Sequence, residues 1–197
     1  MADFNLSETK KNLMKALAGE SMARNRYTFA SEICREQSLY VLSAVFNYTA
    51  DQEKEHAEIF YEHLNSFSGS EINVNGDYPI DATNDVVKLL RYAEQHENSE
   101  HDPIYKSFAE TAQAEGFASV GSSFKMIAEI EKTHAERFSM LADMLENGSL
   151  FVASAVTEWV CLNCGHVQSS LAAPEKCPVC KHDKGFFIRL ELAPFTK

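Results

Sequence analysis

Two short patterns in the sequence place a carboxylate and an imidazole one helical turn apart. They are Glu53-x-x-His56 and Glu131-x-x-His134. Side chains three positions apart lie on the same face of an α-helix, so each pair can offer an oxygen and a nitrogen to one ion. Mixed carboxylate and imidazole ligands suit iron or manganese. The two pairs are therefore candidate parts of a metal site.

A further glutamate precedes each pair at nearly the same distance. The spacings are 33 residues, from Glu20 to Glu53, and 34 residues, from Glu97 to Glu131. Turns expected near Gln37 and Gly116 fall about midway, which brings the two glutamates of each hairpin to the same depth. Two related hairpins then each supply a Glu followed by a Glu-x-x-His. This is the dinuclear carboxylate arrangement of ferritin-like four-helix bundles.

The third helix carries two more glutamates near Glu97. The apolar stripe through Leu90 and Ala93 selects Glu97 and Glu100 for the core face and leaves Glu94 outside it. An unpaired buried carboxylate costs several kcal/mol, so such a set must be protonated, exposed or bound to metal. A solvated helix face explains one glutamate well. It does not explain seven acids and histidines on four matching stripes, which we interpret as a dinuclear metal site.

Four of the five cysteines form two CxxC pairs near the C-terminus: Cys161, Cys164, Cys177 and Cys180. Two such turns around one ion predict a tetrahedral four-sulfur site for iron or zinc. Zinc would make this segment a structural ribbon, whereas iron would make it a one-electron relay. The fifth cysteine, Cys34, lies on the apolar stripe of the first helix and is expected to be an ordinary buried thiol.

The elements that position these residues follow from hydrophobic spacing. Four stretches before residue 147 repeat apolar residues with helical periodicity and predict a four-helix bundle. The glycine-containing segment Phe67–Ile80 predicts a crossover connection, and Asp81 is expected to cap the third helix. Pro103 is expected to bend that helix close to Glu100. We therefore predict a bundle over residues 1–147, a linker over 148–158 and a small domain over 159–197.

The charge balance excludes several classes of partner. The chain has 18 Lys and Arg against 29 Asp and Glu, which gives a net charge of −11. Such a balance disfavours nucleic acids and anionic membrane surfaces. No apolar run approaches the ~20 residues of a membrane span. The N-terminal segment lacks the apolar core of an export signal, so a cytoplasmic location is expected.

The combined motifs resemble those of rubrerythrins. Gly19–Tyr27 resembles the first-helix motif of that family. The other bundle motifs follow in family order: Glu53-x-x-His56, Glu97-x-x-Glu100, Glu115-Gly116-Phe117 and Glu131-x-x-His134. The tail is similar to a rubredoxin-like domain in its segments Trp159–Gly165, Ala173-Pro174 and Cys177–Cys180. The resemblance covers nearly the whole chain, and it departs from the commonest tail pattern at His166, where tyrosine is frequent.

The resemblance implies an all-α ferritin-like four-helix bundle followed by a small rubredoxin-like metal-binding β/loop domain. It also implies a non-haem di-iron peroxidase that reduces hydrogen peroxide to water in defence against oxidative stress. Each chain would hold two iron ions in the bundle and one at the four cysteines, and zinc is a possible occupant of either site as isolated. Electrons would come from a rubredoxin or a nicotinamide-linked reductase through the cysteine-bound iron.

The roles of individual residues are also carried over from the resemblance. Glu53 and Glu131 would bridge the two irons, with Glu20 and Glu97 as terminal ligands. His134 would hold one iron. His56 and Glu100 would exchange on the other iron with redox state, because carboxylates suit ferric and neutral imidazoles ferrous iron. The matching tyrosines, Tyr27 and Tyr105, would donate hydrogen bonds to ligand carboxylates.

Chain length adds an expectation about assembly. The fourth helix continues thirteen residues from His134 to Asn147, about 20 Å at 1.5 Å per residue. The cysteine site would then lie far from the metal pair of its own chain. A head-to-tail homodimer, which the family resemblance supports, would place one tail beside the bundle of the other chain.

Two other functions remain open from the residues. The bundle alone allows ferroxidase activity or iron handling in a ferritin-like cage, although the cysteine tail and Glu100 are unusual for it. A non-catalytic module with structural zinc is the second.

The histidines next to the third-helix ligands, His96 and His101, lie off the stripe and are expected to face solvent.

Overall fold

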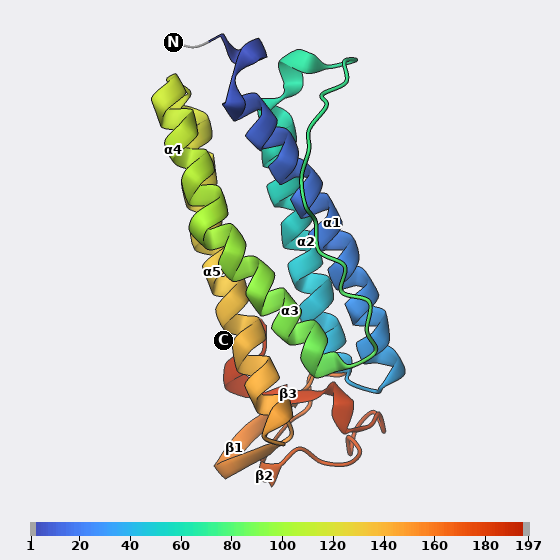
Figure 1. Cartoon of the computed structure of the whole chain (residues 1–197). Coiled ribbons are helices and arrows are strands. Elements are labelled where there is room, and N and C mark those ends of the chain that lie inside the picture. Colours follow the sequence, from blue (N-terminus) through green and yellow to red (C-terminus); the bar gives the residue numbers. More distant parts are fainter. Residues whose placement is uncertain (1–2, 195–197) are drawn as a thin grey trace.

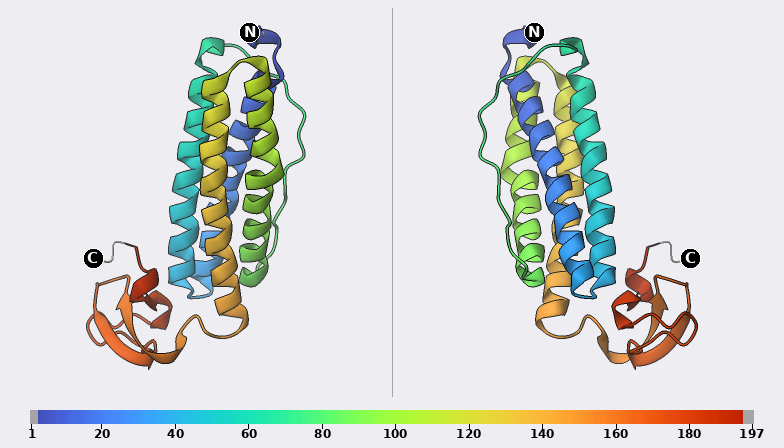
Figure 2. Two further views of the ribbon diagram at one scale, coloured as in Figure 1. Left: turned by 90° about the vertical axis from the view of Figure 1, so that its left-hand side faces the viewer. Right: turned by 90° about the vertical axis from the view of Figure 1, so that its right-hand side faces the viewer.

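Two helical hairpins pack side by side in the computed structural model, which describes residues 3–194. The first consists of α1 (Glu8–Glu36) and α2 (Tyr40–His63). The second consists of α3 (Val86–Ser99), α4 (Tyr105–Glu115) and α5 (Ala118–Glu146). Figures 1 and 2 show the two hairpins packed into one helical bundle with a small sheet at one end. The predicted fold class is confirmed, as are the turns near Gln37 and Gly116.

The bundle core is divided into two apolar clusters. One lies toward the sheet and includes Tyr27, Phe46 and Phe138. The other lies toward the opposite end and includes Phe60 and Phe124. Helices α1, α2 and α5 each contribute apolar residues to both clusters. In each of them the buried glutamates and histidines lie between the residues of one cluster and those of the other. The polar residues therefore form a layer across the middle of the bundle.

A long connection joins the two hairpins. After the short turn Asn65–Phe67, residues 68–85 form no helix or strand and run beside α1 to the start of α3 (Figure 1). We call residues 68–85 the crossover segment. The expected N-cap was wrong: the side chain of Asp85 accepts from the backbone of Lys88, and α3 begins at Val86. Asp81 instead pairs with Arg26 and His96.

The third helix is interrupted and not merely bent. A five-residue π-type turn, Glu100–Ile104, separates α3 from α4. Proline has no N–H to donate and disfavours the helical conformation in the residue before it. Asp102 accordingly takes an extended conformation, with φ −149° and ψ 120°, directly before Pro103. The interruption begins at Glu100, so this acid lies at the junction of two helices.

The tail is a three-stranded antiparallel sheet. Strands β1 (Val152–Cys161), β2 (Val167–Ala172) and β3 (Phe187–Arg189) are arranged in the order β2-β1-β3. Residues 152–158, expected to belong to a linker, are the first part of β1 and pair in part with β2. Trp159 and Phe187 are fully buried in the small core of this domain.

The tail packs closely against the turn between α1 and α2. The ring of Phe186 stacks on Tyr40, with 4.0 Å between centroids and 14° between planes. A Cβ atom added to Gly185 would lie only 1.8 Å from the backbone oxygen of Ser38. Only glycine permits this approach. Arg189 also donates to the backbone oxygen of Ser149, at 3.0 Å. The tail is therefore held against its own bundle by specific contacts.

Glu115 fastens the opposite end of the bundle. Its carboxylate accepts from the backbone N–H groups of Glu8 and Thr9, at 3.0 and 2.9 Å, and from the Thr9 hydroxyl at 2.5 Å. These donors belong to the first turn of α1, where N–H groups lack helical partners and negative charge is favourable. The Glu115-Gly116-Phe117 motif thus ties the end of α4 to the start of α1.

Glu115→Ala is expected to lower the free energy of unfolding by about 1–3 kcal/mol, because three donors lose their acceptor. Glu115→Gln should lose less, since its amide oxygen still accepts. Urea unfolding of both metal-free variants and of the parent protein would measure the difference. Equal stability of Glu115→Ala and the parent would contradict the capping role.

Candidate metal sites

Six buried side chains meet in the middle layer of the bundle. Two sets of ligand atoms each lie within 4.8 Å of one another: Glu20, Glu53, His56 and Glu131 form the first, and Glu53, Glu97, Glu131 and His134 the second. All six side chains are at most 4% exposed. The structure thus brings together every sequence-predicted bundle ligand except Glu100.

Glu53 and Glu131 belong to both sets and turn one oxygen toward each histidine. The distances from Glu53 are 3.1 Å, Oε2 to His56 Nδ1, and 3.0 Å, Oε1 to His134 Nδ1. From Glu131 both corresponding distances are 2.9 Å. A carboxylate that faces two neighbouring positions in this way can bridge two metal ions. The two sets therefore describe one dinuclear site.

The polar atoms of this layer are poorly satisfied by one another. His134 Nδ1 also lies 3.6 Å from Glu97 Oε2, yet none of its contacts has hydrogen-bond geometry. Both oxygens of Glu131, and one oxygen each of Glu20, Glu53 and Glu97, also lack a hydrogen-bond partner. Buried polar groups are rarely left in this state. Converging unpartnered carboxylate oxygens and one unpartnered imidazole nitrogen suit iron, so the residues fit a metal pair.

Protons occupy the site when metal is absent. Burial, with the charges of Glu131, Glu100 and Glu53, raises the pKa of Glu20 well above its usual value. Burial and Glu53 do the same to the pKa of Glu97. Burial alone would lower the pKa of His134, but Glu131, Glu53 and Glu97 outweigh it and raise it to about 12. Metal binding must therefore displace protons.

This leads us to expect that the metal-free protein becomes less stable as the pH rises from 6 to 8.5. Burial alone would lower the pKa of His56, but its contacts with Glu131 and Glu53 raise it to about 9. Burial of the carboxyl group raises the pKa of Glu100 to about 8. Raised pKa values mean that the folded state binds more protons than the unfolded state across this interval. Each extra proton lowers the free energy of unfolding by about 1.4 kcal/mol per pH unit.

Glu53 has the opposite linkage, in a different pH range. Its contacts with His134 and His56 overcome burial and lower its pKa to about 2, so its contribution is lost only as the pH falls below about 4.5. Urea unfolding at pH 6 and 8.5, with and without added zinc, would separate these effects. The stabilisation by metal should be larger at pH 8.5. A metal-free protein that gains stability toward pH 8.5 would contradict this account.

Two buried tyrosines hold the terminal carboxylates. The hydroxyl of Tyr27 donates to Glu97 Oε1, and that of Tyr105 donates to Glu20 Oε1. Burial and the adjacent carboxylates raise both tyrosine pKa values well above 10.0, which keeps the hydroxyls protonated as donors. The predicted contacts of Tyr27 and Tyr105 are thus present.

Glu100 lies outside both sets of ligand atoms, at the junction of α3 and the π-type turn. It is also partly exposed, unlike the six clustered residues. His56 is the residue of the predicted exchanging pair that reaches the site in this structure. His96 and His101, which were expected to face solvent, are half-buried. His96 contacts Asp81 at 3.0 Å, and His101 Nδ1 lies 2.9 Å from the backbone oxygen of Ala128.

The structure adds two residues that sequence reasoning missed. Nε2 of His134 lies 3.1 Å from Gln52 Oε1, and Arg137 approaches the same oxygen at 3.5 Å. An Nε2–H group donated to Gln52 fixes the ring so that Nδ1 faces the carboxylates, a common way of orienting ligand histidines. Gln52 immediately precedes Glu53, but no sequence pattern marks such a partner.

The four cysteines of the tail also come together. The Sγ atoms of Cys161 and Cys180 lie 3.7 Å apart, and those of Cys164 and Cys177 lie 3.6 Å apart. Sulfurs about 2.3 Å from one tetrahedral ion would lie about 3.8 Å from each other, whereas a disulfide needs about 2.05 Å. The backbone N–H of His182 lowers the pKa of Cys180 to about 5, which favours the thiolate that binds metal. The geometry fits one tetrahedral ion.

Fold and sites together define a ferritin-like di-metal carboxylate bundle joined to a four-cysteine metal domain. The sequence model of rubrerythrin matches residues 11–142, and that of the rubrerythrin rubredoxin-like domain matches residues 159–188. The chain belongs to the rubrerythrin family. No helix among residues 3–194 is long and apolar enough to cross a membrane.

Individual relatives agree with this assignment. The chain is 40% identical to rubrerythrin of Clostridium perfringens over 188 residues, which cover 95% of this chain and 96% of the relative. It is 38% identical to rubrerythrin of Porphyromonas gingivalis, over 92% and 89% of the two chains. The solved structure of fully reduced, all-ferrous nigerythrin superimposes with a TM-score of 0.63 at 26% identity, covering 92% and 86%.

Proposed function

We propose that this protein is a non-haem di-iron peroxidase that reduces hydrogen peroxide to water in defence against oxidative stress. The observation that carries the proposal is the presence, in one chain, of a buried dinuclear carboxylate site and a separate four-sulfur site. The first suits a two-electron reaction with a small oxidant, and the second suits one-electron supply. One peroxide, two electrons and two protons give two molecules of water.

The proposed ligand roles follow the geometry described above. Glu53 and Glu131 would each be shared by two iron ions, because each presents one oxygen to each histidine. Glu20 and Glu97 are terminal ligands, and His134 completes one position. His56 completes the other and exchanges there with Glu100. We propose two irons in the bundle and one at Cys161, Cys164, Cys177 and Cys180, with zinc as a competing occupant of either site.

The protein's own groups prepare the site for peroxide. Bound iron supplies the two electrons that cleave the O–O bond. Tyr27 and Tyr105 hold the outer carboxylates in place by hydrogen bonds. Gln52 keeps Nδ1 of His134 directed into the site. The surrounding apolar clusters exclude bulk water from the middle layer.

Electron delivery is proposed to run between two chains of a head-to-tail homodimer. Thirteen helical residues, about 20 Å, separate Tyr40, which contacts the tail, from Glu53. An exposed apolar stripe of Met126, Ile130 and Met140 runs along α5. It leads to a groove that Met140 lines together with Leu162, which lies inside the first CxxC turn. A second chain seated along this face would bring its tail beside the bundle.

The electron donor of the cysteine site is proposed to be a rubredoxin or a nicotinamide-linked reductase in the cytoplasm. The structure supports this through the exposed position of Cys164 and the surface position of Val179 between Cys177 and Cys180. Neither nucleic acid nor membrane is an expected partner of so acidic a chain.

The test is anaerobic stopped-flow mixing of the iron-loaded, fully reduced protein with hydrogen peroxide. Absorption of the cysteine-bound iron and of the di-iron site would be followed together. Rapid oxidation of both centres, with one peroxide consumed per electron pair, is expected. In Cys161→Ser, di-iron oxidation should persist while steady turnover with an external donor is lost. Faster reaction with oxygen than with peroxide, in a cage-sized particle, would favour ferroxidase activity instead.

A further inference from the structure

A cavity of about 560 Å³ lies beside the dinuclear site, between α1, the π-type turn with α4, and the crossover segment. We call it the side cavity. Its inner wall includes Glu100 and Tyr105, and Tyr105 donates directly to Glu20. Its outer wall is formed by residues 75–79 of the crossover segment. The cavity thus reaches from the surface to two side chains that adjoin the metal layer.

The predicted metal ligands of the bundle are most exposed to solvent on the side that faces the side cavity. Each of the six clustered residues is at most 4% exposed. Among the predicted bundle ligands, the partly exposed residue is Glu100, and it lines the side cavity. A solute that enters the bundle must pass a wall of helices, and the helix wall is interrupted where Pro103 separates α3 from α4. Pro103 also lines the side cavity.

Gly19 borders the cavity between Glu100 and Tyr78, and we call the space beside it the narrow part. A Cβ atom added to Gly19 would lie 3.8 Å from Glu100 Oε1 and 4.0 Å from Tyr78 Cε1. The absence of a side chain at position 19 therefore leaves space between these two groups. The hydroxyl of Tyr78 donates to the backbone oxygen of Lys15 at 3.3 Å, which holds its ring over α1.

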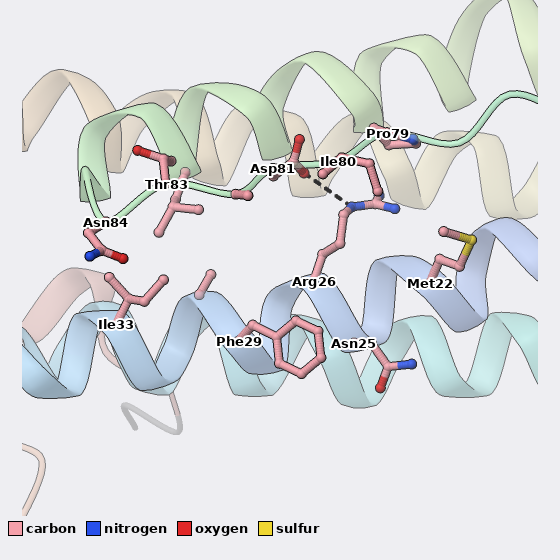
Figure 3. A pocket seen from close by; sticks show the side chains of 13 residues that line it. Met22, Asn25, Arg26, Phe29, Ile33, Pro79, Ile80, Asp81, Thr83 and Asn84 are labelled. Carbon is pink, nitrogen blue, oxygen red and sulfur yellow. Dashed lines mark ion pairs between the residues drawn. The ribbon is translucent and has the colours of Figure 1, made fainter.

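The outer wall is fastened on both sides by one acid. Asp81 pairs with Arg26 of α1, at 3.2 Å, and with His96 of α3, at 3.0 Å. Figure 3 shows the Arg26 side chain reaching from α1 up to Asp81 in the crossover segment. The drawn pocket and the side cavity share Arg26 and Pro79 as lining residues. These two ion pairs hold the crossover segment at Asp81, two residues beyond the part that lines the side cavity.

We infer that the side cavity is the path by which small solutes reach the dinuclear site, with Gly19 and Tyr78 setting the size that can pass. The inference rests on the proposed function for the identity of the oxidant. The mainly apolar lining also contains polar residues, among them Lys15, Asn75 and Ser107, which can form hydrogen bonds with a small solute such as hydrogen peroxide. We expect the side chains that border Gly19 to slow the entry of a bulky organic hydroperoxide. Metal ions reach the empty site by the same path.

The test uses Gly19→Leu, which fills the narrow part, and Tyr78→Ala, which widens it. Ser21→Leu is the matched control, because it adds the same side chain to α1 at an exposed position outside the cavity. The first readout is the rate at which Co²⁺ enters the bundle of a protein whose four-cysteine site has first been filled with zinc, followed by visible absorption. The second is the ratio of rate constants for hydrogen peroxide and cumene hydroperoxide with the reduced, iron-loaded protein.

Gly19→Leu is expected to slow Co²⁺ uptake and the hydrogen peroxide reaction by roughly tenfold or more, and Ser21→Leu to change neither. Tyr78→Ala should raise the cumene hydroperoxide rate and lower the ratio by roughly tenfold. Unchanged uptake in Gly19→Leu together with an unchanged ratio in Tyr78→Ala would overturn the inference. If the parent protein fails to react with peroxide, the proposed function is wrong, while Co²⁺ uptake still decides the path.

Discussion

Glu53→Ala is expected to give a folded protein that binds no iron pair in the bundle and keeps the absorption of its cysteine-bound iron. Glu53 contributes one oxygen to each half of the dinuclear site, so its removal takes a ligand from both metals at once. Loss of an outer partner of a metal ligand already reduces affinity by about 10–100-fold, and loss of a shared ligand should exceed that. Glu131→Ala should behave in the same way.

Iron content per chain and peroxide-dependent oxidation would measure this effect. Glu94→Ala is the matched control, because Glu94 lies on α3 close to Glu97 but pairs with Arg91 outside the core. The control should retain both irons. A Glu53→Ala protein that still binds two bundle irons and oxidises them with peroxide would show that Glu53 is no bridging ligand.

Gly185→Ala is expected to separate the tail from the bundle without harming either metal site. The new Cβ would lie 1.8 Å from the oxygen and 2.9 Å from the carbonyl carbon of Ser38. These are backbone atoms, so no side chain can move aside. The contact between Tyr40 and Phe186 would be lost with it. None of the four cysteines lies in the turn Lys184–Phe186 that contains Gly185, so their site should survive.

The expected result is a larger radius of gyration by X-ray scattering and faster proteolysis near Gly148–Phe151, with unchanged absorption of the cysteine-bound iron. Electron transfer from that iron to the bundle of the second chain in the proposed dimer should slow strongly, because the orientation of the tail is no longer fixed. Lys184→Ala is the control: its side chain lies in the same short turn but pairs with Glu175 on the surface. A compact Gly185→Ala protein with normal transfer would contradict the docking role.

The metal residues could be predicted because ligands repeat with helical spacing and because buried acids stand out in apolar stripes. The pattern Glu-x-x-His occurs twice, at Glu53 and at Glu131. The structure brings both pairs together in one cluster of candidate ligands. Fold class followed from the same spacing. The four-cysteine site could be predicted equally well, because two CxxC pairs in one short segment are typical of a metal site.

Other features depend on contacts between distant segments, which no local pattern encodes. Asp81 was expected to cap α3, but the cap is Asp85, because Arg26 and His96 hold Asp81 elsewhere. Gln52 was missed because a glutamine beside a ligand has no distinguishing spacing. Pro103 indicated a bend, but the extended backbone before it, which breaks the helix, depends on how α3 and α4 both pack on α5.

The polar layer between the two apolar clusters also bears on the lifetime of the chain. Each cluster is a small core of its own. Bound metal would stabilise the polar layer between them. Without metal, the layer depends on protonated carboxyl groups such as Glu20 and Glu97, which lose their protons as the pH rises. A chain that has not acquired iron therefore has its weakest point at mid-height, where Pro103 already interrupts a helix. We expect amide hydrogen exchange there to be fastest in the unloaded chain. In a cell, such local opening is where proteases begin, so iron supply would set how long each newly made chain persists.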